Sequence, residues 1–344
     1  MPIIAIAPML DWSDRHYRYF MRQITQKAIL YTEMIVADAI LHGNLDRLLG
    51  FSLVEKPVAV QLGGSDPHKL ALASKKCQEY GYAAINLNVG CPSDRVKSGN
   101  FGACLMQDSH LVANCIKAMQ DSVNIPITIK HRIGLDYSDD YNFFRDFVAT
   151  VAATGCKQFI VHARNAILSG ISPKQNREIP PLKYDYVYRL KQDMPELEIV
   201  INGGIKTVAE IQEHLKHVDG VMLGREAYHN PYLLANFDQM FFGCEQEVIG
   251  REQIAANMLS YLQEWAATPG FPLHHITRHM IGLYHGCNNA KTWRHTLTNE
   301  IIKTNDIKTY TNLLDFMTID LHPALKNEDS YATQPSLLYR SLGS

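Results

Sequence analysis

The sequence predicts an α/β protein, a (β/α)8 TIM barrel followed by a C-terminal helical bundle domain. Eight short apolar runs rich in Ile and Val recur up to residue 224, and longer amphipathic segments separate them. After about residue 245 only helix-like patterns remain. Buried strands that alternate with helices are typical of a parallel sheet covered by helices. A barrel of this kind usually needs about 250 residues.

The elements can be justified in chain order. The predicted strands are 2–9, 28–35, 57–64, 83–90, 127–134, 158–164, 198–204 and 219–224. Apolar residues spaced three and four apart predict connecting helices over 65–81, 108–120 and 207–218. A doubly wound open sheet is the alternative, but its GxGxxG fingerprint after the first strand is absent.

The rest of the chain predicts a separate helical domain. Four segments with helical spacing follow the barrel, at 251–270, 274–286, 290–303 and 307–318. The last twenty residues are rich in Ser, Asn, Tyr and Pro and predict a loosely ordered tail. We therefore expect a catalytic barrel over 1–243, a helical domain over 244–322 and a tail over 323–344.

Composition excludes several classes of protein. The chain has 344 residues, 46% hydrophobic and 20% charged, as soluble globular proteins do. No apolar stretch reaches the ~18 residues of a membrane span, and the first residues lack a secretion signal. We expect a cytoplasmic protein that is a monomer and has no membrane partner. The seven cysteines form no CxxC pair and no carboxylate cluster marks the strand ends, so we expect no metal.

Candidate site residues stand at the predicted carboxyl ends of the strands, where barrels build their active sites. In strand order they are Ala7, Pro8 and Met9; Gln61; Asn88 and Cys91; Lys130; His162; Asn202, Gly203 and Gly204; Gly224 and Arg225. Glycine turns after strands seven and eight let backbone N–H groups approach a phosphate. Arg225 would add a bidentate donor to that phosphate.

Three of these residues leave alternatives open. Lys130 lies inside an apolar strand and needs an anionic partner, either a neighbouring carboxylate or the pyrimidine end of a flavin. His162 fits a site residue or a core histidine. Cys91 stands between Gly90 and Pro92 and could be packing, a metal ligand, a redox partner or a catalyst; the scattered cysteines argue against metal and disulfide.

Several motifs together resemble the flavin-dependent tRNA dihydrouridine synthases. They are APM at 7–9, VQLGG at 60–64, INLNVGCPSDRVKSGNFGACLM at 85–106, IKHRIG at 129–134, VHAR at 161–164, INGGI at 201–205 and LGREAYHNP at 223–231. The loop LSGISPKQNREIPPL at 168–182 is most similar to the A subgroup, which is associated with tRNA positions 20 and 20a.

The resemblance implies an FMN-dependent oxidoreductase that reduces the uracil 5,6 double bond in tRNA, with NADPH or NADH as reductant. Ala7, Pro8 and Met9 would lie along the flavin ring. Gln61, Lys130 and His162 would bind its polar edge and ribityl chain, and the residues after strands seven and eight its phosphate. A thiol is mostly protonated at neutral pH yet yields its proton readily, so Cys91 fits the acid that protonates the uracil.

RNA must be held by local patches, because the formal net charge is −2. Between residues 271 and 308 there are five Lys or Arg against two acids. Lys291 and Arg294 lie three apart on one predicted helix face, next to Trp293, and Lys174 and Arg177 lie in the 168–182 loop. Asn88 could hydrogen-bond the flipped base. A solvated helix face is the alternative for each basic residue.

Two other functions compete with this one. A flavin barrel that reduces a small molecule, such as a dihydroorotate dehydrogenase-like enzyme, would share the cysteine-proline loop but would not need a basic helical domain. An RNA-binding protein without turnover would not need Gln61, Cys91, Lys130 and His162 together.

Overall fold

The computed structural model describes residues 1–138 and 140–321, and the predicted tail over 323–344 lies outside them. The described residues form two compact units, the first Met1–Val248 and the second beginning at Ile249. The domain limits expected from the sequence, at 243 and 322, remain predictions. Each unit is described by itself below.

Eight parallel strands close into a barrel in the first unit, so the doubly wound alternative is wrong. They are β1 Ile3–Ile6, β2 Ile29–Val36, β3 Val58–Gly63, β4 Ala84–Val89, β5 Ile127–Arg132, β6 Gln158–His162, β7 Glu198–Asn202 and β8 Gly220–Leu223. β1 pairs with β8 to complete the circle. The first strand is shorter than predicted. Pro8, just beyond it, has no N–H to donate to a ladder.

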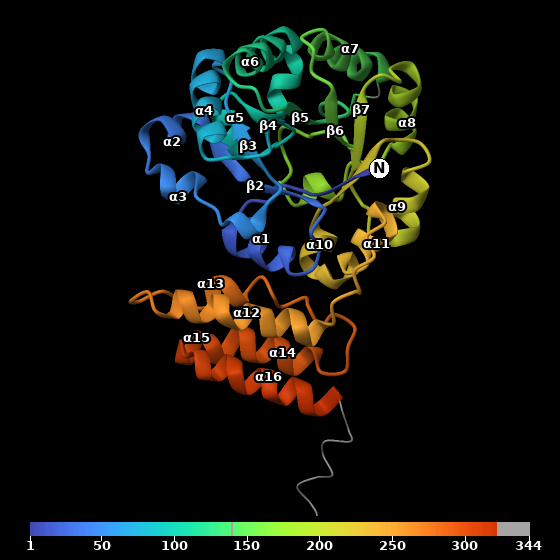
Figure 1. Cartoon of the computed structure of the whole chain (residues 1–344). Helices are drawn as coiled ribbons and strands as arrows, with labels where there is room; N and C mark the ends of the chain where they lie inside the picture. The colour runs from blue at the N-terminus through green and yellow to red at the C-terminus, as the bar shows by residue number, and fades with distance from the viewer. Residues whose placement is uncertain (139, 322–344) are drawn as a thin grey trace, which may run out of the picture. The chain divides into compact units, whose positions relative to one another are not determined.

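Helices surround the barrel (Figure 1). They are α1 Arg15–Arg22, α2 Ala37–His42, α3 Leu45–Leu49, α4 Pro67–Glu79, α5 Asp94–Ser98, α6 Ser109–Ser122, α7 Tyr141–Ala152, α8 Tyr184–Asp193, α9 Val208–His214, α10 Arg225–His229 and α11 Phe237–Phe242. Their starts follow from the sequence. Asp66 accepts two backbone N–H bonds at the start of α4, and Thr207 and Glu210 form a capping box at α9.

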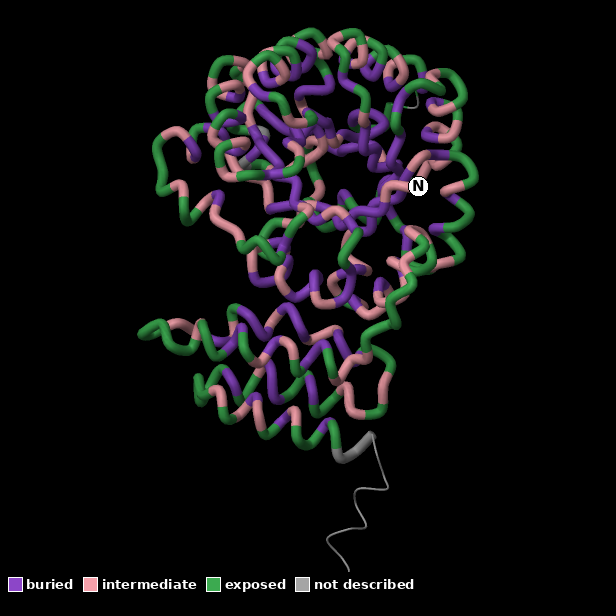
Figure 2. The backbone as a smooth tube through the Cα atoms, viewed as in Figure 1, coloured by how far each residue is buried: buried purple, intermediate pink, exposed green. Residues whose placement is uncertain are grey.

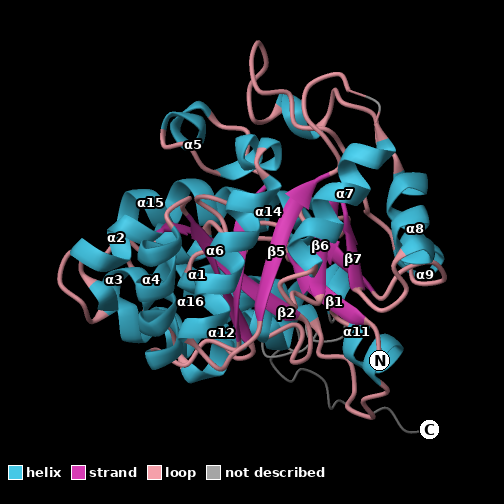
Figure 3. Cartoon of the chain, turned by 90° about the horizontal axis from the view of Figure 1, so that it is seen from above, coloured by secondary structure: helices cyan, strands magenta, loops and turns pink. Residues whose placement is uncertain are grey.

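Side chains alternate between two buried layers on each strand. One set points into the barrel, where Ala5, Tyr31, Ala59, Ile160 and Met222 belong to a single cluster. The other set packs against the helices, as His131 does against Phe144 and Phe147. Most strand residues are buried, as Figure 2 shows, and Figure 3 shows β5, β6 and β7 side by side inside α7 and α8. This alternation decides which strand residues reach the barrel mouth.

The second unit is helical. It contains α12 Arg251–Ala266, α13 His274–Thr277, α14 Ala290–His295, a π-helical turn Thr296–Glu300, α15 Ile301–Thr304 and α16 Ile307–Leu321. The single helix predicted over 274–286 is wrong, because it ends at Thr277. Beyond it the backbone forms successive three-residue turns, such as His279 N–H to Ile276 O at 3.1 Å. Trp293 is fully buried and donates to the Met280 carbonyl at 2.8 Å, which holds this turn segment in place.

Candidate active site

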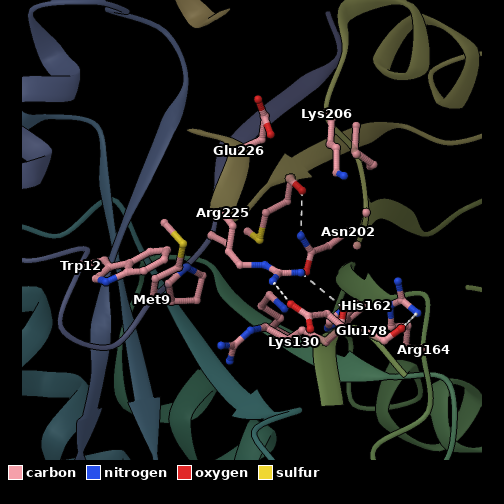
Figure 4. Close-up of a pocket in the computed structure, with 18 of the residues that line it drawn as sticks. Met9, Trp12, Lys130, His162, Arg164, Glu178, Asn202, Lys206, Arg225 and Glu226 are labelled. Carbon is pink, nitrogen blue, oxygen red and sulfur yellow. Dashed lines mark hydrogen bonds and ion pairs between the residues drawn. The ribbon is translucent and has the colours of Figure 1, made fainter. Parts of the chain in front are cut away.

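A cavity of about 670 Å³ opens at the carboxyl ends of the strands (Figure 4). It brings together most of the residues predicted from the strand ends: Ala7, Pro8, Met9, Lys130, His162, Asn202, Gly203, Gly204, Gly224 and Arg225. Arg177 of the 168–182 loop also lines it. Gln61, Asn88, Cys91 and Lys174 were predicted but do not line this cavity. The cavity is therefore assembled from the ends of β1, β5, β6, β7 and β8.

The turn after β7 has room only for glycine. Gly203 and Gly204 have φ of +116° and +74°, a region that other residues rarely adopt. A Cβ on Gly203 would come within 2.6 Å of the His162 ring, and one on Gly204 within 2.6 Å of Leu182. A Cβ on Gly224 would meet nothing within 4 Å. The backbone after β7 thus packs closely against His162 and Leu182, whereas the space beside Gly224 is open. All three glycines line the cavity without a side chain, which suits the phosphate group of a nucleotide cofactor.

Arg225 makes an ion pair across the cavity. Its Nη1 lies 2.6 Å from Oε1 of Glu178, and both side chains are partly exposed. The guanidinium lowers the pKa of Glu178 below its ordinary value through this hydrogen bond. A phosphate would compete with the Glu178 carboxylate for the same donor, since both are anions that bind a guanidinium through paired oxygens.

Lys130 and His162 lie in a strongly cationic environment. Burial, with Arg132 nearby, lowers the pKa of Lys130 to about 7. Burial, with Arg132 and Lys130 nearby, pulls the pKa of His162 well below its ordinary range. Among residues 1–138 and 140–321, no carboxylate forms an ion pair with Lys130, so the structure does not supply the neighbouring carboxylate that was one alternative. The site therefore favours an anionic or electron-rich ligand.

Replacing Lys130 with Met is expected to raise the free energy of unfolding of the cofactor-free protein at pH 7 by about 1–2 kcal/mol. The lysine pKa is about 7 when folded and 10.5 ordinarily, so unfolding takes up a proton between these values. The free-energy cost of burying the charged lysine is largest below pH 7 and decreases as the pH rises to 10.5. Urea unfolding should thus show that Lys130→Met increases the free energy of unfolding more at pH 7 than at pH 9. Lys157→Met, at an exposed position, is the control; equal effects of the two changes would contradict the burial cost.

Cys91 follows β4 and is held through its backbone. The Asn88 side-chain oxygen accepts the N–H groups of Gly90 and Cys91 at 3.1 and 3.0 Å. The Cys91 carbonyl accepts the N–H of Ala103 at 2.9 Å. Its Sγ lies 3.5 Å from Oγ of Ser93, and the residue is half-buried. The loop thus fixes the position of a thiol that remains partly accessible.

Two arginines connect the 168–182 loop to the strand ends. Arg132, 3% exposed, donates to the carbonyls of Gly90, Asn165 and Asn176, each at 3.1 Å. Arg164 donates to the carbonyls of Glu178, at 3.2 Å, and Pro180. The loop is therefore anchored beside the cavity, with Lys174 exposed on its outer surface.

The model of the dihydrouridine synthase (Dus) family matches residues 5–318. The chain belongs to the dihydrouridine synthase family. Two relatives of this family member are named tRNA-dihydrouridine(20/20a) synthase. The protein from Haemophilus ducreyi (strain 35000HP) is 56% identical over 299 residues, 87% of this chain and 92% of that protein. The protein from Synechocystis sp. (strain PCC 6803) is 54% identical, over 87% of this chain and 89% of its own.

Solved structures show the same fold in more distant proteins. An old yellow enzyme homologue from Zymomonas mobilis aligns with a TM-score of 0.52 and 10% identity, covering 69% of this chain and 88% of its own. Morphinone reductase aligns with a TM-score of 0.50 and 10% identity, covering 69% of this chain and 86% of its own. The prediction of a (β/α)8 barrel is thus confirmed for this dihydrouridine synthase family member.

Some residues that line the cavity of this family member were not predicted. They include Trp12, Arg164, Glu178, Lys206, Glu226 and His229. Arg164 carried a signal, because it lies two residues beyond His162 and so on the same strand face. Trp12 stacks on Tyr228 with ring centroids 4.2 Å apart. No strand periodicity could identify that contact, since both residues lie in connections beyond the strand ends.

The helical unit of this family member exposes the basic pair predicted for RNA. Lys291 and Arg294 are exposed on α14, whereas Trp293 between them is fully buried. Trp293 itself therefore cannot contact RNA. Over the described ranges, no three His, Cys, Asp or Glu residues group as metal ligands, and no helix there is long and apolar enough to span a bilayer.

Proposed function

We propose that this protein reduces uridine to 5,6-dihydrouridine at positions 20 and 20a of tRNA, with FMN as cofactor and NADPH as reductant. The observation that carries the proposal is the family match over residues 5–318 in a chain whose strand ends form one cavity. Relatives more than half identical to it bear the name of this activity. The monomeric state and cytoplasmic location expected from the sequence belong to the same proposal.

The cavity suits a flavin mononucleotide. Gly203, Gly204 and Gly224, with Asn202 and Arg225, would hold the phosphate, because all five line the cavity and the three glycines present backbone without a side chain there. Ala7, Pro8 and Met9 would lie along the ring. Lys130 and His162 would contact its polar edge and ribityl chain, together with Gln61 from the neighbouring strand β3. When bound and reduced, the flavin supplies a hydride for carbon 6 of the uracil.

Cys91 completes the reduction in this proposal. Its Sγ–H bond breaks as the proton passes to carbon 5, so that one hydride and one proton saturate the 5,6 double bond. The thiolate that remains must regain a proton from solvent, which a half-buried side chain beside the Ser93 hydroxyl allows.

Four basic side chains would contact phosphates of the tRNA. Lys174 and Arg177 belong to the 168–182 loop, and Lys291 and Arg294 to α14. Asn88 has one amide hydrogen left after its bond to Gln61, and that hydrogen would serve the base.

A direct test uses purified protein with tRNA from a strain that lacks this enzyme. We expect yellow protein that releases FMN on denaturation. With NADPH, nucleoside mass mapping should find dihydrouridine at positions 20 and 20a. Parallel reactions with NADH, and with uracil and orotate in place of tRNA, test the reductant and the small-molecule alternative. Protein that stayed colourless even after refolding in the presence of FMN would contradict the proposal. Reduction of free pyrimidines in the absence of tRNA would also contradict it.

A further inference from the structure

A row of four polar side chains crosses three neighbouring strands next to the Cys91 loop. In the sheet register, Gln61 of β3 lies beside Asn86 of β4, and Asn86 lies beside Thr128 of β5. Asn88 follows Asn86 on the same strand face. Gln61, Asn86 and Thr128 are 1%, 0% and 3% exposed. Because unpaired buried amides are costly, each side chain depends on its neighbours for hydrogen bonds.

The hydrogen bonds link these four residues into one chain. Nδ2 of Asn88 donates to Oε1 of Gln61 at 2.8 Å, and Nε2 of Gln61 donates to Oδ1 of Asn86 at 2.8 Å. Nδ2 of Asn86 then donates to Oγ1 of Thr128 at 2.9 Å. At its other end the chain reaches the backbone N–H groups of Gly90 and Cys91 through Oδ1 of Asn88.

The backbone determines the direction of the whole chain. The N–H groups of Gly90 and Cys91 can only donate, so Asn88 must turn its oxygen toward them and its nitrogen toward Gln61. Gln61 must then accept from Asn88 and donate to Asn86, and Asn86 must donate to Thr128. Turning over any one amide would set two donors or two acceptors against each other. The orientation of each amide therefore depends on all the others.

We propose that Asn86 is a positioning residue, which fixes the amide orientations of Gln61 and Asn88 and thereby the Cys91 loop. Asn86 is fully buried, and the cavity lining does not include it. It acts only through its neighbours. One consequence concerns the cofactor: the chain fixes which end of the Gln61 amide is oxygen and which is nitrogen, and it leaves one N–H of Nε2 unused for a ligand. This inference rests on the proposed function for the role of Cys91, but the hydrogen-bond chain does not.

The matched test uses Thr128, the last side chain of the four, whose hydroxyl in turn donates to the Ile85 carbonyl at 3.4 Å. Thr128→Val removes the acceptor for Asn86 with little change in shape, and Thr128→Ser keeps the hydroxyl. Asn86→Leu removes the central amide. The first measurement is the rate at which iodoacetamide alkylates Cys91 in flavin-free protein, followed by peptide mass mapping. Cys244, also half-buried, provides a reference within each sample. The second is the dissociation constant of FMN, from flavin fluorescence.

Losing a hydrogen bond in a buried network should weaken FMN binding by about tenfold in Asn86→Leu and about threefold in Thr128→Val. Cys91 should be alkylated several-fold faster in both, because its loop is less constrained, while the rate at Cys244 is unchanged. Thr128→Ser should behave as wild type. Ser74→Ala, which removes a buried hydroxyl from α4, should also leave both measurements unchanged.

Unchanged alkylation of Cys91 and unchanged FMN affinity in Thr128→Val would overturn the positioning role, even if Asn86→Leu failed to fold. Equal effects of Thr128→Val and Thr128→Ser would also overturn it, since shape rather than the hydroxyl would then be responsible. Failure of the proposed function is a different result: wild-type protein would bind no FMN or form no dihydrouridine. The alkylation measurement requires neither bound FMN nor dihydrouridine formation, so it tests the positioning role in either case.

Discussion

Cys91→Ala is expected to lower the rate of dihydrouridine formation by about 10²- to 10⁴-fold, the usual contribution of a positioned general acid. The backbone of the loop is held by Asn88 and Ala103 through N–H and carbonyl groups that alanine retains. The affinities for FMN and tRNA should therefore stay within twofold of wild type. Single-turnover reactions with pre-reduced enzyme and tRNA, followed by mass mapping, measure the chemical step directly.

Cys104→Ala is the matched control for this change. Cys104 is also half-buried in the segment after β4, and its thiol lies 3.2 Å from the Phe101 carbonyl. Its replacement should leave turnover unaltered. If Cys91→Ala retained wild-type turnover, another group would have to supply the proton, and the acid role of Cys91 would be wrong.

Replacing both Lys291 and Arg294 with Ala is expected to weaken tRNA binding by about tenfold or more at low salt. Each cation that leaves the interface removes a phosphate contact, so the slope of log K against log[salt] should become shallower by about 1.5. Both side chains are exposed on α14, whereas the buried Trp293 carries the packing, and the fold should not change. Filter binding across a salt series gives affinity and slope together.

Lys27→Ala with Lys157→Ala is the control for lost charge. Both lysines are exposed. They lie just before β2 and β6, at the end of the barrel opposite the cavity. This pair should leave the salt slope unchanged. A similar loss of affinity in both double variants would mean that net charge, not the α14 pair, governs binding.

Much of the barrel could be predicted from sequence because strand, helix and turn signals agree along it. The period-two alternation that buries Ala5 also directs Met9 toward the mouth, and the same argument applies to Lys130 and His162. The segment after His274 was predicted less well. Apolar spacing there resembles a helix, but Gly282 and Gly286 weaken it, and the Met280 carbonyl bonds to Trp293.

Site residues at the ends of strands could be predicted from the sequence. Most site residues contributed by loops could not. Glu178 lies 47 residues before its partner Arg225, and no local pattern connects them. Likewise, Asn86 could be assigned to the inner strand face, but its role depends on the register between β3, β4 and β5. Pairing across strands is a tertiary property, so spacing within one segment cannot reveal it.

The anchoring of the 168–182 loop has a consequence for how this enzyme can diversify. Arg132 and Arg164 grip the loop through main-chain carbonyls of Asn176, Glu178 and Pro180. Every amino acid carries that carbonyl, so exposed positions such as Lys174 and Ile179 can be exchanged without releasing the loop. Asn176 is the exception, because its buried side chain bonds both backbone groups of Ile167. The loop thus combines a fixed main-chain attachment with an outer surface whose side chains can change independently of it.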